Sequence, residues 1–154
     1  MNPKITNWQG KRVWLLGASS GIGAALAKEL ARRGANVAIS ARKADKLLAL
    51  NIPDALILPC DATNVASLAG ARKQLLLAWL GVDLVIYLAG DYVPMRADSF
   101  DLAKAEKVFE VNFLAAMRLT AAVLPDLKAG GGIAFVASVA GYRGLPKALA
   151  YGPG

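Results

Sequence analysis

The fold is decided by the stretch Gly17-Ala18-Ser19-Ser20-Gly21-Ile22-Gly23. It follows a short apolar run, Val13–Leu16, which predicts a buried strand, and it opens a run of helix formers, Ile22–Arg33. Glycines at such a junction allow a tight turn and a close approach by a pyrophosphate, whose charge is favoured at the free N–H groups of a helix start. The stretch therefore predicts a dinucleotide-binding loop, with a plain helix-opening turn as the alternative.

The rest of the chain alternates between predicted strands and helices. Further strands are predicted at 36–40, 56–58, 84–88 and 133–137, and helices at 44–50, 65–80 and from about 98–101 to 124. The three glycines at 130–132 are predicted to form a turn. This alternation, with short connections, predicts parallel strands joined by right-handed crossovers. We therefore expect an α/β fold, a Rossmann-like doubly wound sheet, as a single domain over residues 1–154.

The composition is apolar, with 56% hydrophobic residues and a mean hydropathy of +0.42. Strands covered on both faces account for this. A membrane span is the competing explanation, but the longest apolar stretch, 75–90, contains Asp83 and is shorter than the ~20 residues that a span needs. The start of the chain has no apolar segment typical of a signal peptide. These features predict a cytoplasmic protein that makes no membrane contact.

The charged residues and the missing histidines exclude several kinds of site. The net charge is 18 − 11 = +7, but the basic residues are scattered, so we expect no nucleic-acid partner. The chain contains no histidine, which excludes a Ser-His-Asp triad, a Cys-His pair and a His-ligated metal site. We expect no metal, and any acid or base must be Tyr, Lys, Asp, Glu or Cys.

The spacing Gly-x-x-x-Gly-x-Gly resembles the loop of the classical short-chain dehydrogenases/reductases, which usually read Thr-Gly-x-x-x-Gly-x-Gly. Leu16 stands where that family has the threonine. The resemblance implies oxidoreductase activity and a nicotinamide cofactor. It implies the following cofactor-binding residues in the loop: Gly17, Ser19, Ser20, Gly21, Ile22 and Gly23.

The end of the second predicted strand reads Ser40-Ala41-Arg42-Lys43. An acidic residue here would accept from the ribose of NAD, whereas a basic residue suits the 2′-phosphate of NADP. No carboxylate appears before Asp45, and an arginine presents a planar fork to a phosphate. We therefore expect NADP rather than NAD, with Ser40, Arg42 and Lys43 as contacts. Arg42 and Lys43 could instead be solvated residues that open a helix.

Two further segments match the family. Asp61-Ala62 matches the Asp-Val pair whose aspartate approaches the adenine, although Asp61 could also cap the next helix. Ala89 and Gly90 match the last two residues of an Asn-Ala-Gly segment that flanks the cofactor, and Leu88 replaces its asparagine.

The resemblance also implies a catalytic set of Asn112, Ser138 and Tyr151. Ser138 would hold the substrate oxygen, Asn112 would support a water relay, and Tyr151 would supply a proton. The family pattern Tyr-x-x-x-Lys would place the lysine at position 155, one residue beyond this sequence. Because a free tyrosine has a pKa near 10 and needs a nearby cation to lower it, we expect the chain to be C-terminally incomplete and inactive alone. Lys147 is a poor substitute, since it precedes Tyr151 in a loop.

Three functions are compared on these grounds. The first is hydride transfer between NADPH and a carbonyl or alcohol substrate. The second is a non-catalytic dinucleotide-binding module. The third, a methyltransferase of similar fold, is disfavoured by the catalytic set. The family's strand order, 3-2-1-4-5, would leave the fifth strand at an edge, which predicts abnormal association of this chain and a homo-oligomer for a full-length form. The segment holding Asp91, Tyr92, Met95 and Arg96 is expected to line the substrate cleft.

Overall fold

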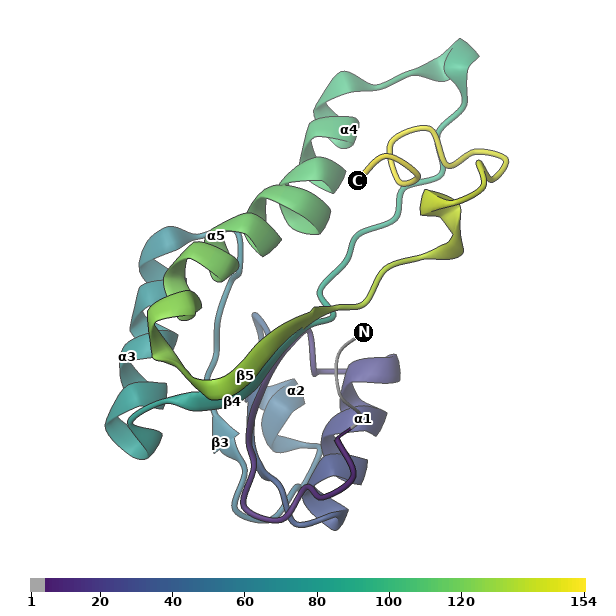
Figure 1. Ribbon diagram of the computed structural model, residues 1–154. Coiled ribbons are helices and arrows are strands. Elements are labelled where there is room, and N and C mark those ends of the chain that lie inside the picture. The colour runs from purple at the N-terminus through teal and green to yellow at the C-terminus, as the bar shows by residue number, and fades with distance from the viewer. Residues whose placement is uncertain (1–4) are drawn as a thin grey trace.

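A parallel sheet with the strand order β3-β2-β1-β4-β5 forms the centre of the computed structural model, which describes residues 5–154 (Figure 1). The strands are β1 Arg12–Leu16, β2 Asn36–Ser40, β3 Leu56–Ile57, β4 Val82–Tyr87 and β5 Leu127–Phe135. Every ladder between them is parallel. The predicted fold class and strand order are therefore confirmed, and β5 lies at an edge of the sheet within the described residues.

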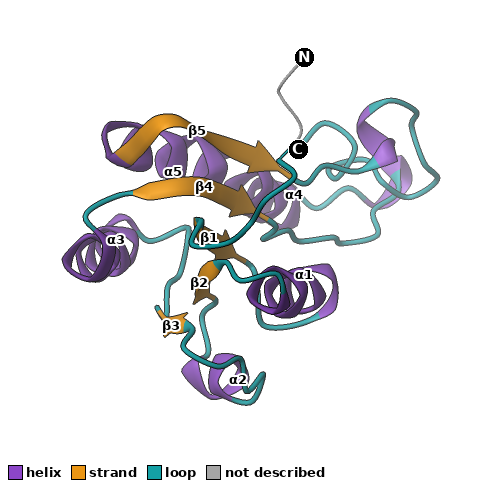
Figure 2. Cartoon of the chain, turned by 60° about the horizontal axis from the view of Figure 1, so that its bottom comes forward, coloured by secondary structure: helices purple, strands orange, loops and turns teal. Residues whose placement is uncertain are grey.

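Helices cover both faces of the sheet (Figure 2). On one face lie α1 (Gly21–Arg32) and α2 (Ala44–Leu48), and on the other lie α3 (Val65–Trp79) and α5 (Ala115–Val123). Helix α4 (Leu102–Phe109) continues into α5 through a π-helical turn, η2 (Glu110–Leu114). Short 3-10 turns occur at η1 (Ala97–Ser99), η3 (Leu124–Asp126) and η4 (Val139–Gly141).

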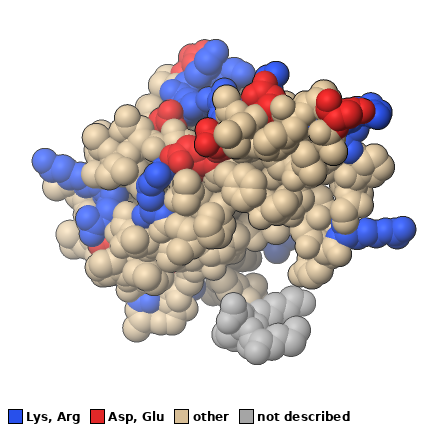
Figure 3. Space-filling view, turned by 90° about the horizontal axis from the view of Figure 1, so that it is seen from above, with Lys and Arg blue, Asp and Glu red and all other residues tan. Residues whose placement is uncertain are grey.

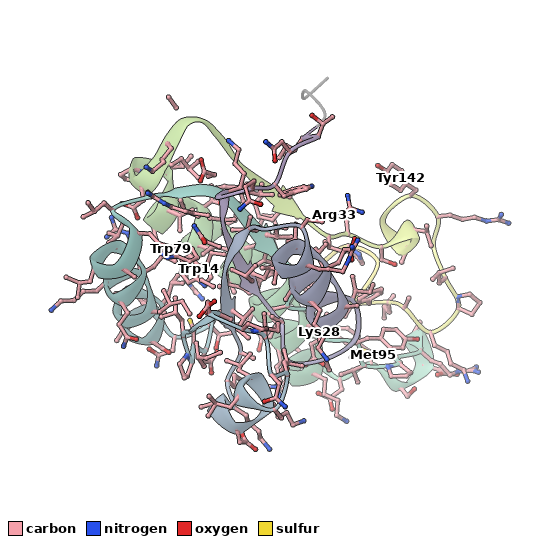
Figure 4. All side chains as sticks on the ribbon, turned by 90° about the horizontal axis from the view of Figure 1, so that it is seen from below. Trp14, Lys28, Arg33, Trp79, Met95 and Tyr142 are labelled. Atoms are coloured by element: carbon pink, nitrogen blue, oxygen red, sulfur yellow. The ribbon has the colours of Figure 1, made fainter. Side chains whose placement is uncertain are left out.

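The core follows from the alternation of side chains along β1. Val13 and Leu15 pack in the cluster beneath α1 and α2, whereas Trp14 and Leu16 pack in the cluster beneath α3 and α5. All four are at most 1% exposed, and full burial of each such side chain contributes about 1.5–3 kcal/mol. Figure 4 labels Trp14 and Trp79 on the same side of the molecule, away from Met95 and Tyr142. The buried β1 thus fixes the position of the loop that follows it.

The glycines at 130–132 were expected to form a turn before the fifth strand, and this prediction is wrong. They lie within β5, which begins at Leu127. The β4–β5 ladder shifts there, because Val82 pairs with Leu127 while Leu84 pairs with Gly132. A Cβ on Gly131 would lie 2.9 Å from the Asp83 carbonyl oxygen. The glycines therefore accommodate an irregularity within the strand, where backbone approaches backbone.

The long predicted helix is confirmed, with an interruption at η2. By length and composition the helical stretch Leu102–Asp126 could cross a membrane. The face of α5 formed by Ala115, Leu119 and Val123 packs in the core beside α3, and core helices can have the same length and composition. The expectation of no membrane contact stays a prediction.

Candidate functional site

The two outer glycines of the loop are required by packing. Gly17 has φ +92°, and a Cβ there would lie 2.5 Å from the backbone nitrogen of Ala89. A Cβ on Gly23 would lie 2.3 Å from the Gly17 carbonyl oxygen. The N–H groups of Gly17 and Ala18 both donate to the Ser40 carbonyl, at 2.9 and 3.1 Å. The loop is therefore held against β2 on one side and against the Ala89–Gly90 segment on the other.

The middle glycine of the loop, Gly21, faces open space. Gly21 has φ +54°, and among the described residues no atom lies within 4 Å of the place its Cβ would occupy. Ile22 beside it is 70% exposed. Ser20 is the N-cap of α1, yet within the described chain its side chain makes no capping bond, and the first turn carries no acidic residue. The N–H groups that begin this helix are thus free to meet an anion.

The residues at the end of β2 differ in exposure to solvent. Arg42 and Lys43 are exposed. Ser40, in contrast, is 1% exposed, and its hydroxyl accepts a 2.8 Å hydrogen bond from the indole N–H of Trp14. The expectation that Ser40 offers its hydroxyl to the cofactor is corrected, because that hydroxyl satisfies a buried donor in the core.

Asp61 follows β3 at the carboxyl end of the sheet, near Arg42. Its Oδ1 accepts from the hydroxyl and the N–H of Thr63, at 2.7 and 3.0 Å. These bonds lower the pKa of Asp61, and the nearby charge of Arg42 adds to the effect. The cap of α3 is Asn64, whose Oδ1 accepts from Ser67 N at 2.9 Å. Asp61 is therefore not that cap, and Ala62 packs against the core.

Asn112 lies in the π-helical turn and faces the segment that follows β4. Its Oδ1 accepts from the N–H of Asp91 at 2.8 Å, and its Nδ2 donates to the carbonyl of Asp91 at 3.1 Å. The same Oδ1 would lie 3.7 Å from a Cβ on Gly90. The structure thus brings Asn112 to the Ala89–Gly90 segment, which the family resemblance implies to flank the cofactor.

Ser138 and Tyr151 lie on the segment after β5. The Ser138 hydroxyl accepts from Ala140 N at 3.2 Å, which caps the turn η4. The Tyr151 ring packs edge-on against Tyr92, with centroids 5.0 Å apart. A Cβ on Gly154 would lie 3.8 Å from the Asn112 Nδ2, so the end of the chain returns to Asn112. Among the hydrogen bonds of residues 5–154, however, none joins two of the three candidate catalytic side chains.

A cleft of about 800 Å³ adjoins this segment, between residues 95–98 and residues 140–153. Of the four residues expected at the substrate cleft, Met95 and Arg96 line this cavity and Asp91 and Tyr92 do not. Met95 is also joined to the far wall, because its N–H donates to the Lys147 carbonyl at 2.8 Å. The backbone of Asp91 is instead hydrogen-bonded to Asn112, and the Tyr92 ring packs against the ring of Tyr151. These contacts explain why neither residue lines the cleft.

Residues 11–153 match the family model for short chain dehydrogenases. The chain belongs to the short-chain dehydrogenase family. It is 31% identical to human dehydrogenase/reductase SDR family member 7, covering 94% of this chain and 49% of that protein. It is 32% identical to the ketoacyl reductase HetN of Nostoc sp., covering 92% and 52%. The chain thus spans about half the length of the curated relatives it matches.

Solved structures of short-chain dehydrogenases share the fold. The Burkholderia cenocepacia enzyme, solved in complex with NADP, has a TM-score of 0.88 and 28% identity, with 96% of this chain and 64% of that chain covered. The Serratia marcescens enzyme has a TM-score of 0.88 and 26% identity, with 95% and 63% covered. Similarity over nearly the whole of the present chain supports the oxidoreductase family and its Rossmann-like fold.

Sequence reasoning missed Tyr87 of this short-chain dehydrogenase. The Tyr87 hydroxyl donates to the Val111 carbonyl at 2.6 Å, next to Asn112 in the chain. Burial raises the pKa of Tyr87 to about 12. Tyr87 is the last residue of an apolar strand, and its sequence context is that of an ordinary core aromatic. No pattern in the sequence therefore indicates a role for its hydroxyl.

Proposed function

We propose that this chain is the nucleotide-binding part of an NADP-dependent short-chain dehydrogenase/reductase, which transfers hydride between NADPH and a carbonyl or alcohol substrate. The observation that carries the proposal is the open start of α1 behind Gly21. There, backbone N–H groups without a capping side chain among the described residues adjoin the open space at Gly21, and this arrangement suits a pyrophosphate. The residues proposed to surround it are Gly17, Ser19, Ser20, Gly21, Ile22, Gly23, Asp61, Ala62, Ala89 and Gly90.

The preference for NADP rests on Arg42 and Lys43. Both are exposed beside the loop, and the second strand ends without a carboxylate that would accept from the NAD ribose. A guanidinium suits a 2′-phosphate because it can donate two parallel hydrogen bonds. The NADP complex of the similar Burkholderia enzyme is in keeping with this preference.

For catalysis we propose the family roles of Tyr151, Ser138 and Asn112. A bound nicotinamide would supply the hydride, Tyr151 would donate the proton, Ser138 would hold the substrate oxygen, and Asn112 would brace the site. General acid catalysis of this kind typically contributes about 10²–10⁴-fold in rate.

A second candidate is a dinucleotide-binding module without catalysis. The use of both ends of the Asn112 carboxamide by the Asp91 backbone favours it. Oxidation of NADPH in the presence of a simple ketone separates the two, since a module would bind NADPH and leave it unoxidised.

The proposed binding is tested by calorimetric titration of this chain with NADPH and with NADH. We expect tighter binding of NADPH. Gly21→Ala should weaken both nucleotides by more than about tenfold, because its Cβ would occupy the phosphate surface. Gly10→Ala is the matched control, since Gly10 also has a positive φ, +71°, and within the described residues a Cβ there would also meet open space, but Gly10 precedes β1 and lies outside the loop. Unchanged affinity in Gly21→Ala, or no binding by the unaltered chain, would reject the site.

We also propose a single domain over residues 1–154, a cytoplasmic location, no metal, nucleic acid or membrane partner, and a homo-oligomeric full-length form. On the face in Figure 3, basic and acidic side chains lie near one another around a broad uncharged area, which suits small-molecule rather than nucleic-acid binding. Phe135 and Val136, 52% and 49% exposed at the end of edge strand β5, support association of this chain. Light scattering should show species larger than a monomer, and a monodisperse monomer would count against association.

A further inference from the structure

Tyr87 is a buried polar residue that the proposed roles leave unused. Its side chain is 3% exposed and packs among the core residues beneath α5. Its hydroxyl donates to the Val111 carbonyl at 2.6 Å. The bond connects the last residue of β4 to the residue that precedes Asn112.

The Val111 carbonyl is available because of the π-helical turn. The N–H of Ala115 donates to the Glu110 carbonyl, five residues back. In a continuous α-helix this N–H would donate to Val111, four residues back. Val111 therefore loses its α-helical donor, and the Tyr87 hydroxyl supplies another.

A second anchor lies one residue further along. The Asn112 carboxamide bonds both backbone groups of Asp91, which follows Tyr87 by four residues. The exit of β4 thus holds the π-helical turn at two successive points, once through a hydroxyl and once through a backbone. An α-helix turns by about 100° per residue, so removal of the π turn would swing Asn112 by roughly that angle relative to α5.

We propose that Tyr87 is a positioning residue, whose hydroxyl keeps the π-helical turn in the register that points Asn112 at Asp91. The inference rests on the proposed role of Asn112 in the site. The Tyr87 hydroxyl remains a hydrogen-bond donor across the physiological pH range, because its pKa of about 12 keeps it protonated.

Hydrogen–deuterium exchange of the nucleotide-free chain tests this proposal. Tyr87→Phe keeps the ring and removes only the hydroxyl. We expect exchange to rise by roughly three- to tenfold in the peptides around Asp91 and over 110–116, which is the range that one hydrogen bond contributes. Exchange in β1 should stay near that of the unaltered chain. Tyr142→Phe is the control, since Tyr142 is 96% exposed.

Asn112→Ala tests the same coupling from the other anchor, and does not depend on Tyr87→Phe folding. It should loosen residues 110–116 as well as Asp91, and the double variant should add little to either single one. An equal rise in β1 and at Asp91 in Tyr87→Phe would mean that Tyr87 only stabilises the fold, and would overturn the proposal. So would unchanged exchange at Asp91. No nucleotide is used, so failure of NADPH binding would reject the proposed function without affecting this outcome.

Discussion

The loop region, residues 12–43, and the segment after β5, residues 136–154, differ in how the fold supports them. The loop region is held by backbone hydrogen bonds to β2 and by backbone contacts at Gly17 and Gly23 that leave no room for a side chain. Among the described residues, the later segment is held by the Val136 N–H bond to the Tyr87 carbonyl, by the bridge between Met95 and Ala148, by the burial of Ala150 in a small cluster with Val108, and by contacts between side chains. The proposed nucleotide-binding loop and the proposed catalytic residues Ser138 and Tyr151 thus lie in regions that the fold supports unequally.

This difference indicates that the two functions can be separated. A site built from backbone geometry fails when the backbone is disturbed, whereas a site built from side chains on a weakly held segment can lose a side chain at small cost to folding. Variants of the packed glycines Gly17 and Gly23 should therefore change stability and binding together, a variant of the exposed Arg42 should change binding alone, and variants of Ser138 or Tyr151 should change neither.

The largest effect is expected from Gly17→Ala. The new Cβ would lie 2.5 Å from the Ala89 nitrogen at φ +92°, so both the contact and the backbone conformation are unfavourable. We expect a loss of roughly 3–5 kcal/mol in the free energy of unfolding, measured by urea denaturation with tryptophan fluorescence. Gly70→Ala, in the open middle of α3, should instead gain up to about 1 kcal/mol. Equal stability of the two variants would mean that the loop is not packed as described.

Much of the loop region could be predicted from the sequence, because its information is local. The apolar run at β1 and the helix formers that follow the glycines each act within a few residues, and the strand and the helix that they predict are confirmed. The nonlocal features could not be predicted. Ser40 looked like a ligand contact because its partner, Trp14, is 26 residues away. The π-helical turn depends in the same way on Tyr87, in another element.

The next largest effect is expected from Tyr87, at the end of β4, which lies between the two regions in the sequence. Burial raises the pKa of Tyr87 to about 12, against an ordinary value of about 10 in the unfolded chain. Because the protonated form is favoured in the folded state, this stabilisation is complete below pH 10 and is lost as the pH rises towards 12. The loss amounts to about 2–3 kcal/mol. Tyr87→Phe should lack this part of the alkaline slope, while Tyr142→Phe should keep it. Parallel curves for all three proteins would contradict the burial of an un-ionised Tyr87.

A smaller effect is expected at the edge of the loop region. Arg42→Ala should weaken NADPH by about tenfold and leave NADH nearly unchanged, because only NADPH carries the 2′-phosphate. The difference should shrink as salt is added, since Arg42 is exposed. Lys73→Ala, on the exposed surface of α3, is the matched control for a lost charge. Equal weakening of both nucleotides would show that Arg42 supports the loop generally instead of selecting NADP.

The smallest effects are expected from Ser138→Ala and Tyr151→Phe. Ser138 caps only a three-residue turn, and phenylalanine keeps the edge-on contact with Tyr92. Each should change the free energy of unfolding by less than about 0.5 kcal/mol and NADPH affinity by less than about twofold. Both are measured on the samples used for Gly17→Ala. If either variant weakens NADPH by more than about fivefold, the later segment contributes to the nucleotide site, and binding and catalysis are not separable in this fold. If neither variant changes NADPH affinity while Gly17→Ala does, Ser138 and Tyr151 make no contribution to the nucleotide site.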